Sequence, residues 1–92
     1  MTHTIREKTK LLNRVRRIRG QVDAIERALE HELGCSDVLH LVAAVRGAID
    51  GLMAEVMEDH IRLHVVDPAR ERNSERAERA QELIEAVHAY LK

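Results

Sequence analysis

The chain has 92 residues, of which 45% are hydrophobic and 34% charged, with no Trp or Phe, one Tyr and one Cys. This length allows a single small domain over residues 1–92, with a core of aliphatic side chains and stability that oligomerisation could supplement. One cysteine excludes an internal disulfide and is typical of a protein in a reducing compartment. The sequence has no apolar run of about 18 residues and no secretory leader. We therefore expect a cytoplasmic protein.

The net charge of −1 conceals an uneven distribution along the chain. Residues 1–20 carry seven basic side chains and one acidic one, whereas residues 21–92 carry eight basic and fifteen acidic ones. A basic segment on an otherwise acidic protein favours a polyanionic partner such as nucleic acid. The alternative is that this segment is simply a solvated helix face.

A first long helix is predicted over residues 5–32, because Thr4 and Glu7 fit a capping box. Gly34 is suited to end this helix at its C-terminus. Its apolar residues recur with spacings of 4 and 3, namely Leu11, Val15, Ile18, Val22, Ile25 and Leu29.

A second long helix is predicted from Cys35 to about residue 66, with the same alternation of apolar residues at Val38, Val42, Val45, Ile49, Leu52 and Val56. Gly47 and Gly51 lie inside it, and each costs roughly 1 kcal/mol relative to Ala. Their presence therefore indicates that something, most simply a partner helix, packs very close.

A shorter third helix is predicted near the C-terminus, with apolar positions at Ala77, Ala80, Ile84, Val87 and Leu91. Residues 67–74 are polar and are interpreted as a connector, although Asp67 and Pro68 could instead begin an early third helix. The sequence thus predicts an all-α subunit with two long antiparallel helices and a short C-terminal helix.

A thiol begins the second helix and a His-x3-His pair ends it. His60 and His64 lie one turn apart on one face and can share a ligand. Cys35 precedes His60 by 25 residues, roughly 37 Å along a straight helix, so it can join the histidines only from a second, antiparallel chain. The hairpin of long helices also brings His3 near His60 and His64. This donor set suits Ni, Co, Zn or Cu(II), and a solvated His pair with an inert Cys is the alternative.

The other candidates receive structural interpretations. His31, His40 and His88 are expected on the surface or partly exposed, and Met53 and Met57 in the core. The sequence holds no hydrolase elbow, phosphate loop or paired acid–base arrangement, so we do not expect an enzyme.

Three segments, RVRRIRGQVDAIERAL, AAVRGAIDGLMAEVMEDHI and HAYLK, resemble the CsoR/RcnR family of copper-sensing and nickel/cobalt-sensing repressors over nearly the whole chain. This resemblance implies an antiparallel helical dimer that assembles into a disc-like tetramer. It further implies that the tetramer binds operator DNA and that metal binding releases it, derepressing an exporter gene for metal homeostasis.

The resemblance points to the nickel/cobalt branch (RcnR/DmeR-like), whose ligand set matches His3, Cys35, His60 and His64. Copper(I) sensors of the family have a second Cys in place of His64 and a Tyr in place of Gly34. Formaldehyde sensors have Pro in place of Thr2 and usually Glu in place of His64, and persulfide sensors need two Cys. The implied effector is Ni(II) or Co(II), with Zn(II) as a further candidate.

The resemblance also associates basic residues with operator binding, namely Arg14, Arg17 and Arg46, with Lys10 and Arg16 as additions. Since the sequence holds no helix-turn-helix or zinc finger, contacts to phosphates and DNA shape are expected to dominate. Two alternatives stay open: a formaldehyde- or electrophile-sensing repressor that uses Cys35, and an RNA- or protein-binding helical adaptor.

Overall fold

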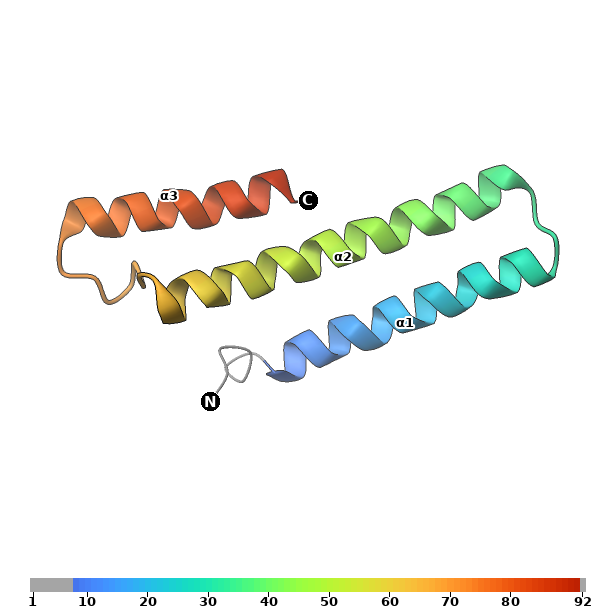
Figure 1. The fold of residues 1–92 in the computed structure, drawn as a ribbon, viewed down its shortest axis with the longest axis horizontal. Helices are drawn as coiled ribbons and strands as arrows, with labels where there is room; N and C mark the ends of the chain where they lie inside the picture. The colour runs from blue at the N-terminus through green and yellow to red at the C-terminus, as the bar shows by residue number, and fades with distance from the viewer. Residues whose placement is uncertain (1–7, 92) are drawn as a thin grey trace.

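The computed structural model describes residues 8–91, which form three α-helices: α1 (Lys8–Glu30), α2 (Cys35–His64) and α3 (Ser74–Tyr90). The two long helices form a hairpin, and α3 folds back along the C-terminal half of α2 (Figure 1). Both α1 and α3 pack on α2, and the described parts of α1 and α3 make no contact with each other. The predicted all-α subunit is confirmed; its assembly into dimers and tetramers stays a prediction. No helix in residues 8–91 is long and apolar enough to cross a membrane.

The subunit is a single layer of helices. Its extents are 57 × 26 × 13 Å and its radius of gyration is 17.2 Å, whereas a compact chain of this length would have about 12 Å. The shortest extent is close to the diameter of one helix, about 10–12 Å. One layer cannot enclose a core, and no large side chain of residues 8–91 is fully buried.

The turn between α1 and α2 differs from the prediction. Helix α1 ends at Glu30, and Glu32 adopts the left-handed conformation, with φ of 54°. The backbone N–H of Leu33 donates to Ala28 O at 3.0 Å and that of Glu32 to Leu29 O at 3.2 Å, which is the Schellman arrangement. The prediction that Gly34 ends α1 is therefore wrong, because Gly34 is extended and is the N-cap of α2.

The two predicted stripes of the long helices are each only partly buried. On α1, Leu11 is buried and Ile18 half-buried, whereas Val22 is exposed. On α2, Val45 is buried and Ile49 exposed. A stripe with spacings of 4 and 3 covers two adjacent sides of a helix, and the hairpin partner covers only one of them. The stripe of α3 is confirmed, since all five of its members are buried or half-buried.

The connector between α2 and α3 confirms the interpretation of residues 67–74. Asp67 O accepts hydrogen bonds from the backbone of Arg70 and Glu71, and Asp67 Oδ1 accepts one from Ala69 N at 3.1 Å. These bonds form one isolated turn, and α3 begins only at Ser74, so the alternative of an early third helix is wrong. Asn73 caps α3, because its Oδ1 accepts a hydrogen bond from Arg76 N at 3.0 Å.

Candidate metal and nucleic-acid sites

The predicted metal ligands lie at opposite ends of α2. His60 and His64 occupy its last turns, and their ring centroids are 5.1 Å apart. Cys35 is exposed at the first residue of the helix, which continues unbroken for 30 residues. His3, like Thr4 and Glu7 of the predicted capping box, lies outside the described residues. Within residues 8–91, one chain does not gather three or more His, Cys, Asp or Glu side chains into a metal site.

One face of α2 is largely uncovered by the other two helices, although Met53 and Met57 on it line an open apolar hollow with Val87 and other residues of α3. At about 100° per residue, this face carries Cys35 at one end, His60 and His64 at the other, and Arg46 together with five apolar residues between them. We call these five the open stripe; their exposed fractions range from 40% to 66%, and they are Leu39, Val42, Ile49, Met53 and Met57. The prediction that the two methionines lie in the core of the chain is therefore wrong.

The two glycines of α2 have different surroundings. A Cβ atom at Gly51 would lie 3.1 Å from Nη1 of Arg14, whereas one at Gly47 would meet no side chain of the described residues within 4 Å. Among residues 8–91, the predicted close approach therefore exists at Gly51 and not at Gly47, and the neighbour of Gly51 is an arginine side chain of α1.

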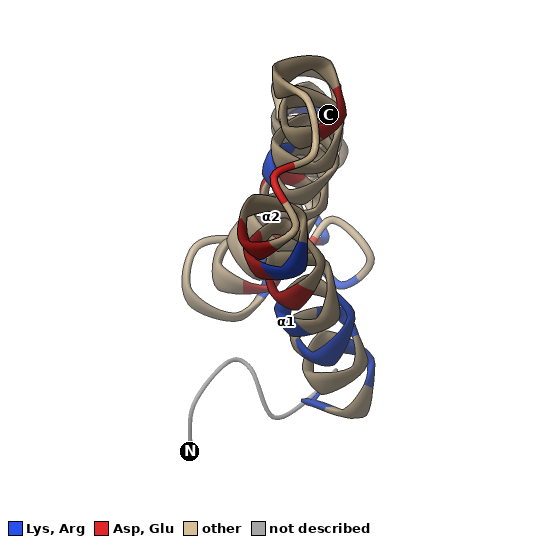
Figure 2. Ribbon diagram, turned by 90° about the vertical axis from the view of Figure 1, so that its right-hand side faces the viewer, with Lys and Arg blue, Asp and Glu red and all other residues tan. Residues whose placement is uncertain are grey.

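Lys and Arg residues are frequent along α1 (Figure 2). Of the basic residues predicted to bind DNA, four lie on α1 and Arg46 lies on α2. Arg16, Arg17 and Arg46 are exposed, and Arg16 Nη1 donates to Asn13 Oδ1 at 3.2 Å. An open depression on the surface of α1 is lined by Thr9, Lys10, Asn13, Arg14 and Arg17. Several cations thus share one accessible side of the molecule.

Two of these cations contact an acidic residue that the sequence interpretation missed. Glu55 Oε1 lies 3.5 Å from Lys10 Nζ and 3.4 Å from Arg14 Nη2. A usable signal was present, because a hairpin that turns at residues 33–34 places position 14 opposite a position near residue 53. Counting across the turn would therefore have brought Glu55 to these cations.

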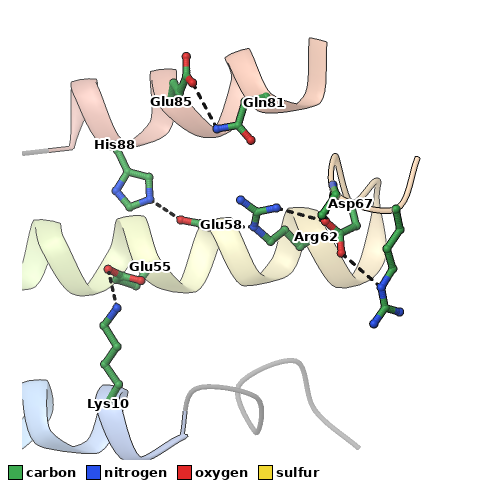
Figure 3. A network of polar contacts seen from close by, with 10 residues as sticks. Lys10, Glu55, Glu58, Arg62, Asp67, Gln81, Glu85 and His88 are labelled. Carbon is green, nitrogen blue, oxygen red and sulfur yellow. Dashed lines mark hydrogen bonds and ion pairs between the residues drawn. The ribbon is translucent and has the colours of Figure 1, made fainter. Parts of the chain in front are cut away.

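A second polar network joins α3 and the connector to the last turns of α2 (Figure 3). His88 Nε2 lies 2.6 Å from Glu58 Oε1, and Arg62 Nε donates to Glu58 Oε2 at 2.8 Å. Arg62 also donates from Nη1 to Asp67 Oδ1 at 3.2 Å. Burial disfavours the Glu58 carboxylate, but hydrogen bonds from Arg62 and His88 outweigh it and lower the pKa of Glu58.

The remaining histidines follow the prediction, since His31 and His40 are exposed and His88 is partly exposed. The contact of His88 with Glu58 was not predicted, because the two residues are 30 positions apart in the sequence. Only the return of α3 over α2 brings them together.

Comparison with known proteins gives one consistent family. Residues 7–89 match the model of a family described as metal-sensitive transcriptional repressors. Over the full length of both chains, this protein is 48% identical to an uncharacterised protein encoded in the bioA 5′ region of Serratia marcescens and 39% identical to the transcriptional repressor RcnR of Salmonella paratyphi B.

A solved structure gives the same result for the fold. It is a glutamate-to-histidine variant of the formaldehyde-responsive regulator FrmR from Salmonella enterica serovar Typhimurium, with a TM-score of 0.66 and 45% identity. The match covers 97% of this chain and 99% of that one. The relatives thus include RcnR as well as a formaldehyde-responsive regulator, and they leave the effector of this chain undecided.

Proposed function

Because the chain belongs to the metal-sensitive transcriptional repressor family, we propose that it binds operator DNA without metal and is released by Ni(II) or Co(II), derepressing a metal-efflux gene. The metal would be held between two chains by Cys35 of one and by His60 and His64 of the other. The observation that supports this proposal most is the open stripe of α2, which has these ligands at its two ends.

The open stripe has the layout that a two-fold pairing of α2 requires. In such a pairing the same patch of both chains meets, and the helices run antiparallel. Cys35 lies 14 residues before Ile49, and the two histidines lie 11 and 15 residues after it. A two-fold axis close to Ile49 would therefore place each Cys35 beside the histidines of the other chain. The same contact would bury the five apolar side chains of the stripe.

The donor set is chemically suited to the proposed effector. One thiolate and two imidazoles, with His3 as a fourth ligand, make an N/S set that borderline divalent metals prefer. Zn(II) is served by the same donors. Binding requires a deprotonated thiol and neutral imidazoles, so the affinity should fall on acidification.

The DNA contacts in this proposal come from Lys10, Arg14, Arg16, Arg17 and Arg46. Four of the five are exposed and Arg14 is half-buried. Long cationic side chains on the outside of a helix suit contacts to phosphate oxygens.

A metal titration tests the proposal. Metal-free protein is bound to a fluorescein-labelled duplex from upstream of its own coding sequence, and Co(II) is added while anisotropy and the thiolate–cobalt absorption band are recorded. We expect both signals to change at the same stoichiometry. The variants Cys35→Ala and His64→Ala should lose tight metal binding and keep DNA binding. The matched control is His40→Ala, because His40 is an exposed histidine of α2 outside the open stripe.

A formaldehyde-sensing repressor is the second candidate, supported by the structural neighbour FrmR and by the exposed thiol at the start of α2. The thiolate form of cysteine is the nucleophile that attacks an electrophile, and the exposed position of Cys35 leaves its sulfur accessible to one. Release of the duplex by formaldehyde but not by Co(II) would favour this candidate. A cobalt–thiolate band that persists in Cys35→Ala would show that Cys35 is not a ligand.

A further inference from the structure

Glu55 lies between α1 and α2, where it contacts two of the residues proposed to bind DNA. One of its carboxylate oxygens, Oε1, serves both Lys10 Nζ and Arg14 Nη2. The side chains of Lys10, Arg14 and Glu55 are 54%, 33% and 21% exposed. The ion pairs are therefore open to solvent, and the cations can be reached by another anion.

Gly51 provides the space that Arg14 occupies over α2. The Nη1 atom of Arg14 lies 3.1 Å from the position that a Cβ of residue 51 would take. Gly51 and Glu55 are four residues apart and so lie on the same face of the helix. The guanidinium thus lies across α2, above the glycine and against the carboxylate of the next turn. Gly51 therefore leaves room for this cation, and Glu55 contacts it.

The contacts that hold the cations are weak by their geometry. The distances of 3.4 Å and 3.5 Å exceed the roughly 2.7–2.9 Å of strong charge-assisted hydrogen bonds. A phosphate oxygen is an acceptor for the same donors, and arginine binds phosphate as readily as carboxylate. The carboxylate and a DNA phosphate therefore have overlapping partners.

We propose that Glu55 is a positioning residue that competes with DNA phosphate for Lys10 and Arg14 and so limits the affinity of the protein for DNA. The proposal rests on the DNA binding proposed above. It implies that Arg17, which is exposed on the same helix, contributes fully to DNA binding in the unmodified protein. Lys10 and Arg14 contribute less than their charges allow.

The test compares Glu55→Gln with the wild type on a fluorescein-labelled duplex of mixed sequence, by anisotropy over a series of salt concentrations. Glutamine keeps the shape and removes the charge. Each cation released to a phosphate should steepen the slope of log affinity against log salt concentration by about 0.9. If the variant and the wild type bind equally at 1 M salt, this difference in slope makes the variant bind about eightfold more tightly at roughly 0.1 M salt. We expect Glu55→Gln to gain one or two such contacts.

Two controls separate this effect from a change in net charge. Glu26→Gln removes the same charge from an exposed site near the other end of α1. This site is roughly 24 Å from Lys10 along the helix, which exceeds the screening length of about 10 Å. The Glu26→Gln variant should therefore leave the salt slope of DNA binding unchanged. In a Lys10→Ala, Arg14→Ala background, Glu55→Gln should have no larger effect than Glu26→Gln.

The possible results are distinct. If the wild type binds the duplex and Glu55→Gln matches Glu26→Gln, the competition by Glu55 is refuted while the proposed repressor function stands. An undiminished gain in the background without Lys10 and Arg14 would also refute it. If the wild type binds neither this duplex nor its own upstream DNA, both proposals fail.

Discussion

Mixed dimers offer the sharpest test of a metal site shared between chains. One chain carries Cys35→Ala, and the other carries both His60→Ala and His64→Ala. Neither homodimer retains a complete ligand set. In the heterodimer one site collects both defects and the other keeps the intact cysteine of one chain and the intact histidines of its partner.

The expected magnitude follows from the length of α2. The helix is continuous over 30 residues, so Cys35 and His60 are separated by roughly 37 Å. Metal–sulfur and metal–nitrogen bonds measure about 2.0–2.3 Å, and no side chain closes that gap. Random pairing of equal amounts makes half of the dimers mixed, with one of their two sites intact. Metal capacity should therefore return to about one quarter of the wild-type value.

Co(II) absorption of separately tagged, co-expressed chains provides the measurement. The thiolate–cobalt band should be absent from either homodimer and present at one site per purified heterodimer. A pair of differently tagged Cys35→Ala chains is the control for the tags. If verified heterodimers hold no tight site, the shared arrangement is wrong, and α2 would have to break near Gly47 or Gly51 for one chain to reach its own histidines.

Three further predictions concern single residues. Arg17→Ala should weaken DNA binding and reduce the salt slope by about 0.9 without changing metal affinity. An unchanged slope in anisotropy titrations would show that Arg17 is only solvated. Arg14→Ala should have a smaller effect on DNA binding, because Glu55 already contacts that guanidinium. Glu32→Gly should raise the free energy of unfolding by about 0.5–1 kcal/mol in urea titrations. A left-handed non-glycine residue costs about 1–2 kcal/mol, and the greater entropy of glycine in the unfolded chain offsets part of the gain from removing that cost. A loss of stability would contradict the assigned helix end. The pKa of Asp67 is lowered mainly by the hydrogen bond from Ala69 N, which together with Arg62 outweighs desolvation. The resulting stabilisation is present above the ordinary carboxyl pKa and is lost as the pH falls through the lowered pKa. The melting temperature of Asp67→Asn should therefore fall less steeply than that of the wild type from neutral to acidic pH, and parallel declines would exclude this contribution.

The sequence alone determined the features that depend on local periodicity. Apolar spacing and turn residues defined two long helices and a short one, and the polar run at 67–74 defined the connector. The separation of Cys35 from His60 was also determined, because the rise of a helix converts residue number into distance. The ligand assignment rests on spacing together with the resemblance, the DNA-binding residues rest on the resemblance, and both stay predictions.

The tertiary structure decided what each helix face meets. Periodicity identified apolar stripes, but whether Val22 or Ile49 is buried depends on which helix covers that side, and a one-layer hairpin leaves both exposed. The left-handed turn residue after α1 is Glu32 instead of Gly34, and this choice depends on the geometry of both helices that share the turn. The contacts of Glu55 with Arg14 and of Glu58 with His88 join residues 41 and 30 positions apart. Such pairs form only once the helices have packed, because side-chain contact depends on register between elements and not on spacing within one.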